Sequence, residues 1–149
     1  MNEFALDFMP MQLAQAKASL ARYNQMTAAY QLTLSEVQLE HLVTCRFETL
    51  KTTGRVEFGE GILGELIYAF CDSPYINQTD YEETLVGLQE RFYYFKGECC
   101  ELLSDDELID AMRLIFNEIA RGSLDYLDRM DRQTLYRIAK TGGAENDKQ

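Results

Sequence analysis

Two short segments of this 149-residue sequence carry the polar and aromatic residues that could form a binding site. The first contains Arg55, Glu57 and Phe58, and the second contains Asp72, Ser73 and Tyr75. A guanidinium, two carboxylates and hydroxyl groups beside aromatic rings could hold a small molecule or dock a protein. The same groups could instead serve the fold, with Arg55 paired to a carboxylate and Tyr75 closing the end of a helix bundle. These residues are the candidate site, and both interpretations stay open.

Metal ligands and catalytic groups are sparse. His41 and Cys45 have the spacing of two zinc ligands on one helical turn, and Cys99 is followed directly by Cys100. Neighbouring side chains on a helix point about 100° apart, so two adjacent cysteines rarely bind one metal ion. The sequence contains no phosphate-binding glycine loop, no nucleophile elbow and no Glu-x-x-His pair. We therefore predict no metal, no cofactor and no catalytic residue, and an enzyme is the less favoured class.

The stretch between the two segments predicts a buried helix over residues 61–72. Its apolar residues recur at helical spacing and form one wide stripe made of Ile62, Leu63, Leu66, Ile67 and Phe70. Pro74 ends this helix, because proline disfavours the helical conformation in the residue before it. A helix this apolar is buried on most sides, so we expect the other helices to pack around it.

Five further helices are predicted from the same periodicity, at about residues 10–30, 33–53, 79–97, 104–121 and 123–138. Capping boxes at Thr33, Thr79 and Ser104 begin three of them. Pro10 suits the first turn of the first helix, and Gly54 suits a left-handed cap at the end of the second. The predicted fold is all-α, a single-domain bundle of about six helices around the buried central helix.

The only stretch that could be extended is 55–58, where Val56 and Phe58 alternate with Arg55 and Glu57. No second strand is predicted to pair with it, so we interpret it as a structured connector between helices. Residues 1–140 are predicted to form the helical domain. Residues 141–149 contain no apolar residue larger than alanine and are predicted to form a disordered tail.

The charge of the chain is strongly negative and unevenly distributed. The formal net charge is −11, of which residues 1–54, with four Lys/Arg and five Asp/Glu, contribute −1. Nucleic-acid and anionic-membrane binders usually carry the opposite sign, so we expect neither partner. No secretory signal and no membrane-spanning run is predicted. The four cysteines lack a disulfide-scaffold spacing and indicate reduced thiols in the cytoplasm.

Three segments carry a resemblance to a known family. They are GRVEFG at Gly54–Gly59, YAFCDSPYI at Tyr68–Ile76 and LSDDEL at 103–108. They resemble an uncharacterised family of small bacterial proteins, a domain of unknown function. The similarity covers about residues 32–126. The resemblance implies a cytoplasmic bacterial protein and brings no activity, substrate or catalytic residue.

Two classes of function remain. The favoured class is a small acidic helical protein that binds another protein or forms a homodimer, because Tyr93 and Tyr94 lie off the apolar seam of their helix and tyrosines are enriched at interfaces. The alternative is a helical bundle that binds a small molecule or a metal and could act as an enzyme, with its site at the 55–58 and 72–75 connectors.

Overall fold

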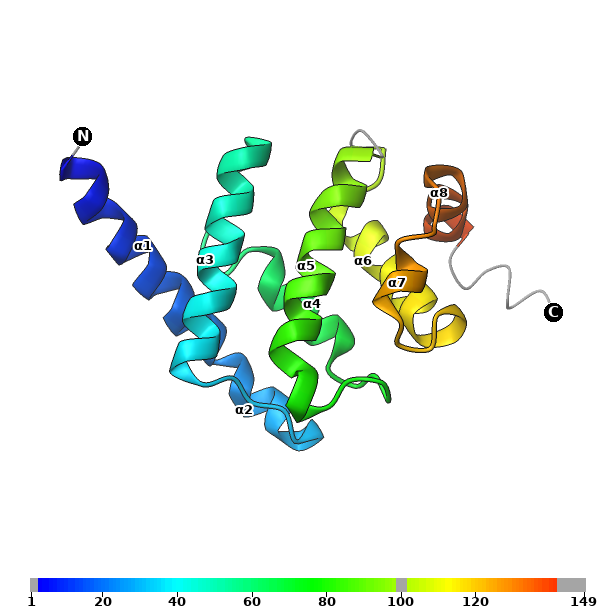
Figure 1. Cartoon of the computed structure of the whole chain (residues 1–149), viewed down its shortest axis with the longest axis horizontal. Helices are drawn as coiled ribbons and strands as arrows, with labels where there is room; N and C mark the ends of the chain where they lie inside the picture. The colour runs from blue at the N-terminus through cyan, green and yellow to red at the C-terminus, as the bar shows by residue number, and fades with distance from the viewer. Residues whose placement is uncertain (1–2, 99–101, 142–149) are drawn as a thin grey trace.

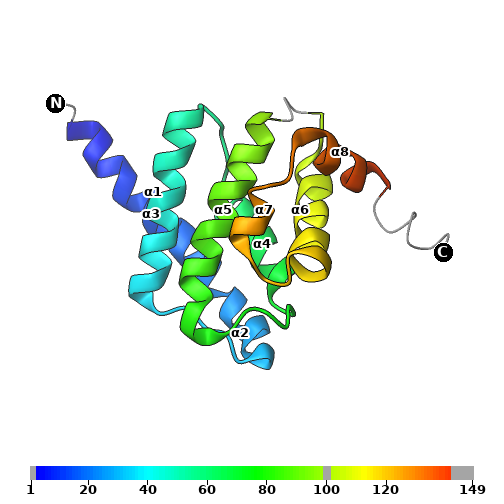
Figure 2. The same cartoon turned by 45° about the vertical axis from the view of Figure 1, so that its right-hand side comes forward.

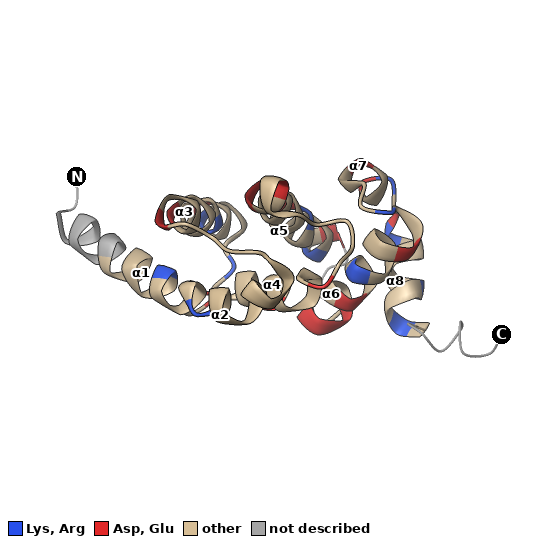
Figure 3. Ribbon diagram, turned by 90° about the horizontal axis from the view of Figure 1, so that it is seen from below, with Lys and Arg blue, Asp and Glu red and all other residues tan. Residues whose placement is uncertain are grey.

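The computed structural model describes residues 3–98 and 102–141, with side chains from Met11 onward. The helices form two layers, which Figure 3 shows edge-on. One layer consists of α3 (Glu36–Thr53), α5 (Tyr81–Glu98) and the short α7 (Leu124–Leu127). The other consists of α1 (Glu3–Ala21), α2 (Tyr23–Thr27), α4 (Ile62–Phe70) and α6 (Asp105–Leu114). The last helix, α8 (Arg132–Thr141), packs on α6 at the end of the molecule far from α1 (Figures 1 and 2).

Three short elements complete the chain. Two are 3-10 helices, η1 (Ala28–Tyr30) and η2 (Gln78–Asp80), and the third is a π-helical turn, η3 (Ile115–Ile119), that continues α6. The prediction of an all-α, single-domain fold is confirmed, and no strand occurs within the described residues. The connector that could have been extended is irregular backbone between α3 and α4.

The short helix α4 is the buried centre that the sequence predicts. Six of its nine residues are buried, and it packs against α2, α5 and α6. The ring of Phe70 meets that of Phe116 edge-on, with 5.5 Å between the ring centroids. Both layers contribute to the same core, and the two candidate segments lie before and after α4.

Two of the three predicted caps lie at other residues. Ser104 caps α6 as predicted, with Glu107 completing the capping box. The cap of α3 is Ser35 rather than Thr33, because the Thr33 amide instead donates to the side chain of Gln78 at 2.8 Å. The cap before α5 is Asn77 rather than Thr79, and its side chain begins the 3-10 turn η2 that leads into the helix.

The first and last predicted helices are each broken in two. The first begins at Glu3, so Pro10 lies within α1 rather than in its first turn. It ends at Ala21, because Asn24 forms two hydrogen bonds with the backbone of Leu34 and ties α2 to the loop before α3. The last breaks before Asp131, whose carboxylate accepts from the Thr134 amide at 2.7 Å and begins α8 as a separate helix.

The carboxyl end of α8 is Thr141, the residue at which the predicted disordered tail begins. Residues 142–149 lie outside the described residues, so the disordered tail and the domain boundary at 140 stay predictions.

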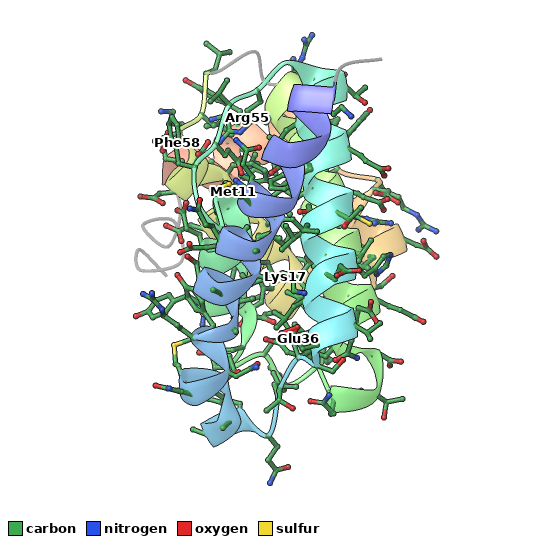
Figure 4. The ribbon with its side chains drawn as sticks, turned by 90° about the vertical axis from the view of Figure 1, so that its left-hand side faces the viewer. Met11, Lys17, Glu36, Arg55 and Phe58 are labelled. Atoms are coloured by element: carbon green, nitrogen blue, oxygen red, sulfur yellow. The ribbon has the colours of Figure 1, made fainter. Side chains whose placement is uncertain are left out.

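At the opposite end of the molecule, Lys17 ties α1 to α3. Its Nζ lies 3.1 Å from the carboxylate of Glu36 (Figure 4).

Gln89 is a polar residue on the buried side of α5. Its side chain is fully buried, and neither Nε2 nor Oε1 has a hydrogen-bond partner within the described residues. An unpaired buried amide costs about 1–3 kcal/mol, so we expect Gln89→Met to raise the free energy of unfolding by about that amount. Urea unfolding measures the difference, and the exposed Gln133→Met is the control. A loss of stability in Gln89→Met alone would contradict this expectation.

Candidate functional site

Glu57 is the residue that fixes the connector between α3 and α4. Its side chain is only 5% exposed. One carboxylate oxygen, Oε1, accepts from Arg46 Nε at 2.9 Å and from the Ile62 amide at 3.2 Å. The other, Oε2, accepts from Arg55 Nε at 2.7 Å, and the Tyr93 hydroxyl donates to both oxygens at 3.0 and 3.1 Å. The hydrogen-bonding capacity of Glu57 is therefore used within the protein.

The protonation states of this cluster follow from burial and charge. Burial by itself would raise the pKa of Glu57, but hydrogen bonds from Arg55 and Arg46 outweigh it and hold the pKa below its usual value. Burial and the neighbouring Glu57 carboxylate raise the pKa of the Tyr93 phenol well above its usual value. At neutral pH, Glu57 is therefore an anion and Tyr93 a neutral hydrogen-bond donor.

Arg46 is a fully buried cation that sequence reasoning missed. Its Nη1 donates to the Gly59 carbonyl oxygen at 2.7 Å, whereas Nη2 has no hydrogen-bond partner in the described part of the chain. The spacing of the sequence indicates this burial. Arg46 follows Val43 by three residues and Leu42 by four, which places it in the apolar stripe of α3. A charged residue at such a position needs a buried counter-ion, and here that counter-ion is Glu57.

Arg55 extends the cluster to the second half of the chain. Its Nη2 lies 2.6 Å from Asp105 Oδ2, and Lys96 Nζ lies 3.0 Å from the other oxygen of Asp105. Burial would raise the pKa of Asp105, but the hydrogen bonds from Lys96 and Arg55 hold it below its usual value. This chain of charges joins the connector to the end of α5 and the start of α6.

Phe58 and Val56 point away from this buried cluster and into solvent. Phe58 is 87% exposed and Val56 is 75% exposed. Both help to line a hollow of about 340 Å³ between α1, the end of α3 and the connector, whose lining also includes Gln12, Phe47, Leu50 and Lys51. In Figure 4, Phe58, Arg55 and the exposed Met11 are labelled on the side of the molecule that faces the viewer. The cluster around Glu57 thus holds an exposed apolar surface in a fixed position.

The second predicted segment follows α4 and is tied to the end of α6. Asp72 accepts from Arg113 Nη2 at 3.0 and 3.2 Å. Ser73 is buried and donates to Asn117 Oδ1 at 2.6 Å, while its oxygen accepts from the Tyr75 amide. Asn117 lies in the π-helical turn η3, an element that periodicity did not predict and that is frequent at functional sites.

Tyr75 packs on the turn at Gly122 while part of its ring remains exposed. Gly122 has a φ of +87°, and a Cβ at that position would lie 2.5 Å from Tyr75 Cβ. The turn therefore needs glycine for its backbone conformation and for space. Tyr75 closes the space between the loop after α4 and the end of η3.

The two predicted segments lie at opposite ends of α4 and line separate hollows. Hydrogen bonds and ion pairs within the protein engage four of their polar side chains, those of Arg55, Glu57, Asp72 and Ser73. Phe58 differs from them because it is presented to solvent. A binding role for Arg55, Glu57, Asp72, Ser73 and Tyr75 stays a prediction.

The residues weighed as metal ligands have other surroundings. His41 Nδ1 lies 2.6 Å from Glu82 Oε2 on α5, and Cys45 is a free thiol one turn away. Cys99 and Cys100 lie outside the described residues. Within residues 3–98 and 102–141, no group of three His, Cys, Asp or Glu side chains is arranged to hold a metal ion. Over the same residues, no helix is both long and apolar enough to cross a membrane.

Together these features define a single-domain, all-α protein with two interhelical connectors, one held by a buried polar cluster around Glu57 and the other by partly buried polar contacts of Ser73. The chain belongs to a family of unknown function, DUF6323, whose family model matches residues 19–145. This confirms that it is a member of an uncharacterised family, as the resemblance of residues 54–59 and 68–76 implies. No curated protein and no solved structure was found to match the chain.

Proposed function

We propose that this protein acts through protein–protein contact, by binding a second copy of itself through the face that carries Val56, Phe58 and Met11. The observation that carries the proposal is Phe58, which is 87% exposed and lines the edge of a hollow of about 340 Å³. Hollows of about 300 Å³ or more can hold a small organic group, so a phenyl ring fits. In a two-fold dimer, the Phe58 ring of each copy would enter the hollow of the other.

The rigidity of the connector supports this surface as an interface. Glu57 accepts hydrogen bonds from α3, α5 and the first turn of α4, so the backbone beside Phe58 is fixed before any partner arrives. Binding loses less conformational entropy when the contacting residues are already ordered. An exposed aromatic side chain on a rigid segment therefore suits an interface better than it suits a mobile loop.

The charge distribution also favours this face. Two copies with a net charge of −11 repel each other, and the repulsion is least where the charge is least. Residues 1–54 carry a net charge of only −1, and Lys51 and Arg55 line the hollow. The proposed place of action is the cytoplasm, where the free thiols of Cys45 and Cys71 would stay reduced.

The test is sedimentation velocity of the full chain over a range of concentrations. We expect a reversible dimer, and we expect Phe58→Asp to weaken it by about 30-fold or more, the loss typical of a central interface residue. Tyr94→Asp places the same charge at another exposed aromatic residue and is expected to leave the dimer intact. A chain that is monomeric at every concentration, or a dimer that Phe58→Asp does not weaken, would overturn the proposal.

A further inference from the structure

A second surface, on the layer that contains α4, combines exposed tyrosine rings with acidic side chains. Tyr68 projects from α4, is 70% exposed and stands between two hollows of about 400 and 380 Å³. Tyr30 lines the first hollow, and Tyr23 lines the second. The two hollows share Tyr68 and Asp110, so they form one groove across α2, α4 and α6, which we call the Tyr68 groove.

Three acidic side chains of the Tyr68 groove lack counter-ions among the described residues, whereas Asp72, which also lines it, is paired with Arg113. Glu65, Asp106 and Asp110 line it, and none of them forms an ion pair with the described residues. Figure 3 shows acidic residues gathered along α6 in this layer. Arg113 also lines the groove, but it already pairs with Asp72 and donates to the Ala69 carbonyl oxygen at 2.7 Å. The groove therefore keeps a local excess of negative charge.

The crowding of these carboxylates affects the pKa of Glu65. Burial raises the pKa of Glu65, and a hydrogen bond with the neighbouring Asp106 raises it further, to about 7. Asp105, another acid of α6, has Arg55 and Lys96 as basic partners. The groove is the place where a cation from outside would relieve the repulsion.

The walls of the groove are fixed. The Tyr23 hydroxyl lies against the backbone of Gly64, where a Cβ would come within 2.6 Å of it, and it donates to Glu60 at 3.3 Å. α4 is packed on both α2 and α6, so the tyrosines and the acids keep their relative positions. A partner that matches this surface would not have to order it.

We infer that the Tyr68 groove docks a segment of a partner protein that bears lysine or arginine side chains. Aromatic faces attract ammonium and guanidinium groups, and carboxylates form charge-assisted hydrogen bonds with them. The groove offers both within one rigid surface, and its negative charge is complementary to such a segment. This surface is separate from the Phe58 face, so either proposal can fail without the other.

The experiment measures binding of a fluorescently labelled peptide of alternating lysine, arginine and alanine residues by anisotropy, at physiological salt concentration. Tyr68→Ala removes the exposed ring without opening the core and is expected to weaken binding by about 5-fold or more. Asp106→Asn with Asp110→Asn is expected to weaken it by at least about 10-fold. The matched control is Glu48→Gln with Glu90→Gln, two exposed acids on the opposite layer, which changes the net charge equally.

The control variant is expected to change the affinity by less than about 2-fold, because rim charges far from a docking site act mainly through weak screened attraction. Equal losses in the groove and control variants would show attraction to net charge alone and would overturn the inference. Absence of peptide binding to the unmodified chain would also overturn it. Binding of spermidine at the groove without binding of the peptide would likewise overturn the inference.

Discussion

Replacing Glu57 with alanine is expected to lower the free energy of unfolding by about 3–5 kcal/mol, because it leaves a buried guanidinium without its counter-ion. Arg46 is fully buried, and its Nε donates to Glu57. The substitution also removes the acceptor of the Tyr93 hydroxyl and of the Ile62 amide. Domains of this size are stable by only about 5–15 kcal/mol, so the loss would move the urea midpoint far toward zero.

A neighbouring acid provides the matched control for this prediction. Glu60 lies in the same connector, but among the described residues its carboxylate accepts only from the Tyr23 hydroxyl, at a longer distance of 3.3 Å. Glu60→Ala should therefore cost about 1 kcal/mol or less. If Glu57→Ala does not fold, Glu57→Gln retains an acceptor oxygen and gives a measurable intermediate. Equal stability of the Glu57 and Glu60 variants would show that the buried cluster contributes little.

The same cluster has a definite dependence on pH. The pKa of Glu57 is lower in the folded protein than in the unfolded chain, so its stabilisation is fully present above the unfolded value of about 4.3. It is lost as the pH falls through the lower folded-state pKa. The difference in stability between the wild type and Glu57→Gln should therefore shrink in acid and stay constant around neutral pH.

Gly61→Ala is expected to cost about 3 kcal/mol or more. Gly61 has a φ of +55°, and a Cβ there would lie 2.1 Å from Glu57 Oε1 and 2.4 Å from Arg46 Nη2. The new methyl group would force the ion pair apart, and the backbone conformation of Gly61, with φ +55° and ψ −139°, adds about 1–3 kcal/mol of strain for a residue with a Cβ. Thermal and urea unfolding of the variant measure the sum of the two effects.

Gly59→Ala is the control that measures backbone strain without displacement of the Arg46–Glu57 pair. The φ of Gly59 is +57°, nearly that of Gly61, but a Cβ at Gly59 would have no atom within 4 Å. Gly59→Ala should therefore cost only the backbone strain of about 1–2 kcal/mol. The excess loss in Gly61→Ala reports the displaced ion pair together with any further strain from the ψ of −139° at Gly61. Equal losses at the two glycines would show that the Arg46–Glu57 pair shifts at no cost.

The helical fold could be predicted because its signals are local. The stripe on α4, the left-handed cap at Gly54 and the capping box at Ser104 each depend on residues within a few positions of one another. The cap of α3 could not be predicted in the same way. Thr33 and Ser35 are both good caps, and the choice depends on Gln78, which is 45 residues away and binds the Thr33 amide.

In the candidate site, too, local features could be predicted from the sequence and long-range contacts could not. Its residues were found because the connectors are rich in turn-forming and polar residues, and the pairing of Arg55 with a carboxylate is what the structure shows. The partners of Glu57 were missed, because Tyr93 is 36 residues away and Arg46 lies inside an apolar stripe. The Tyr68 groove was also missed, because it forms only when α2, α4 and α6 come together.

The hydrogen bonds of Glu57 couple local unfolding of the connector at residues 54–61 to unfolding of the core. Irregular segments usually exchange their amide hydrogens rapidly through local fluctuations that leave the core closed. The Ile62 amide donates to Glu57, whose other partners lie in the connector and on α3 and α5. Residues 54–61 therefore belong to the same cooperative unit as the core. Proteolytic cleavage within this connector would report unfolding of the whole domain rather than the flexibility of a loop.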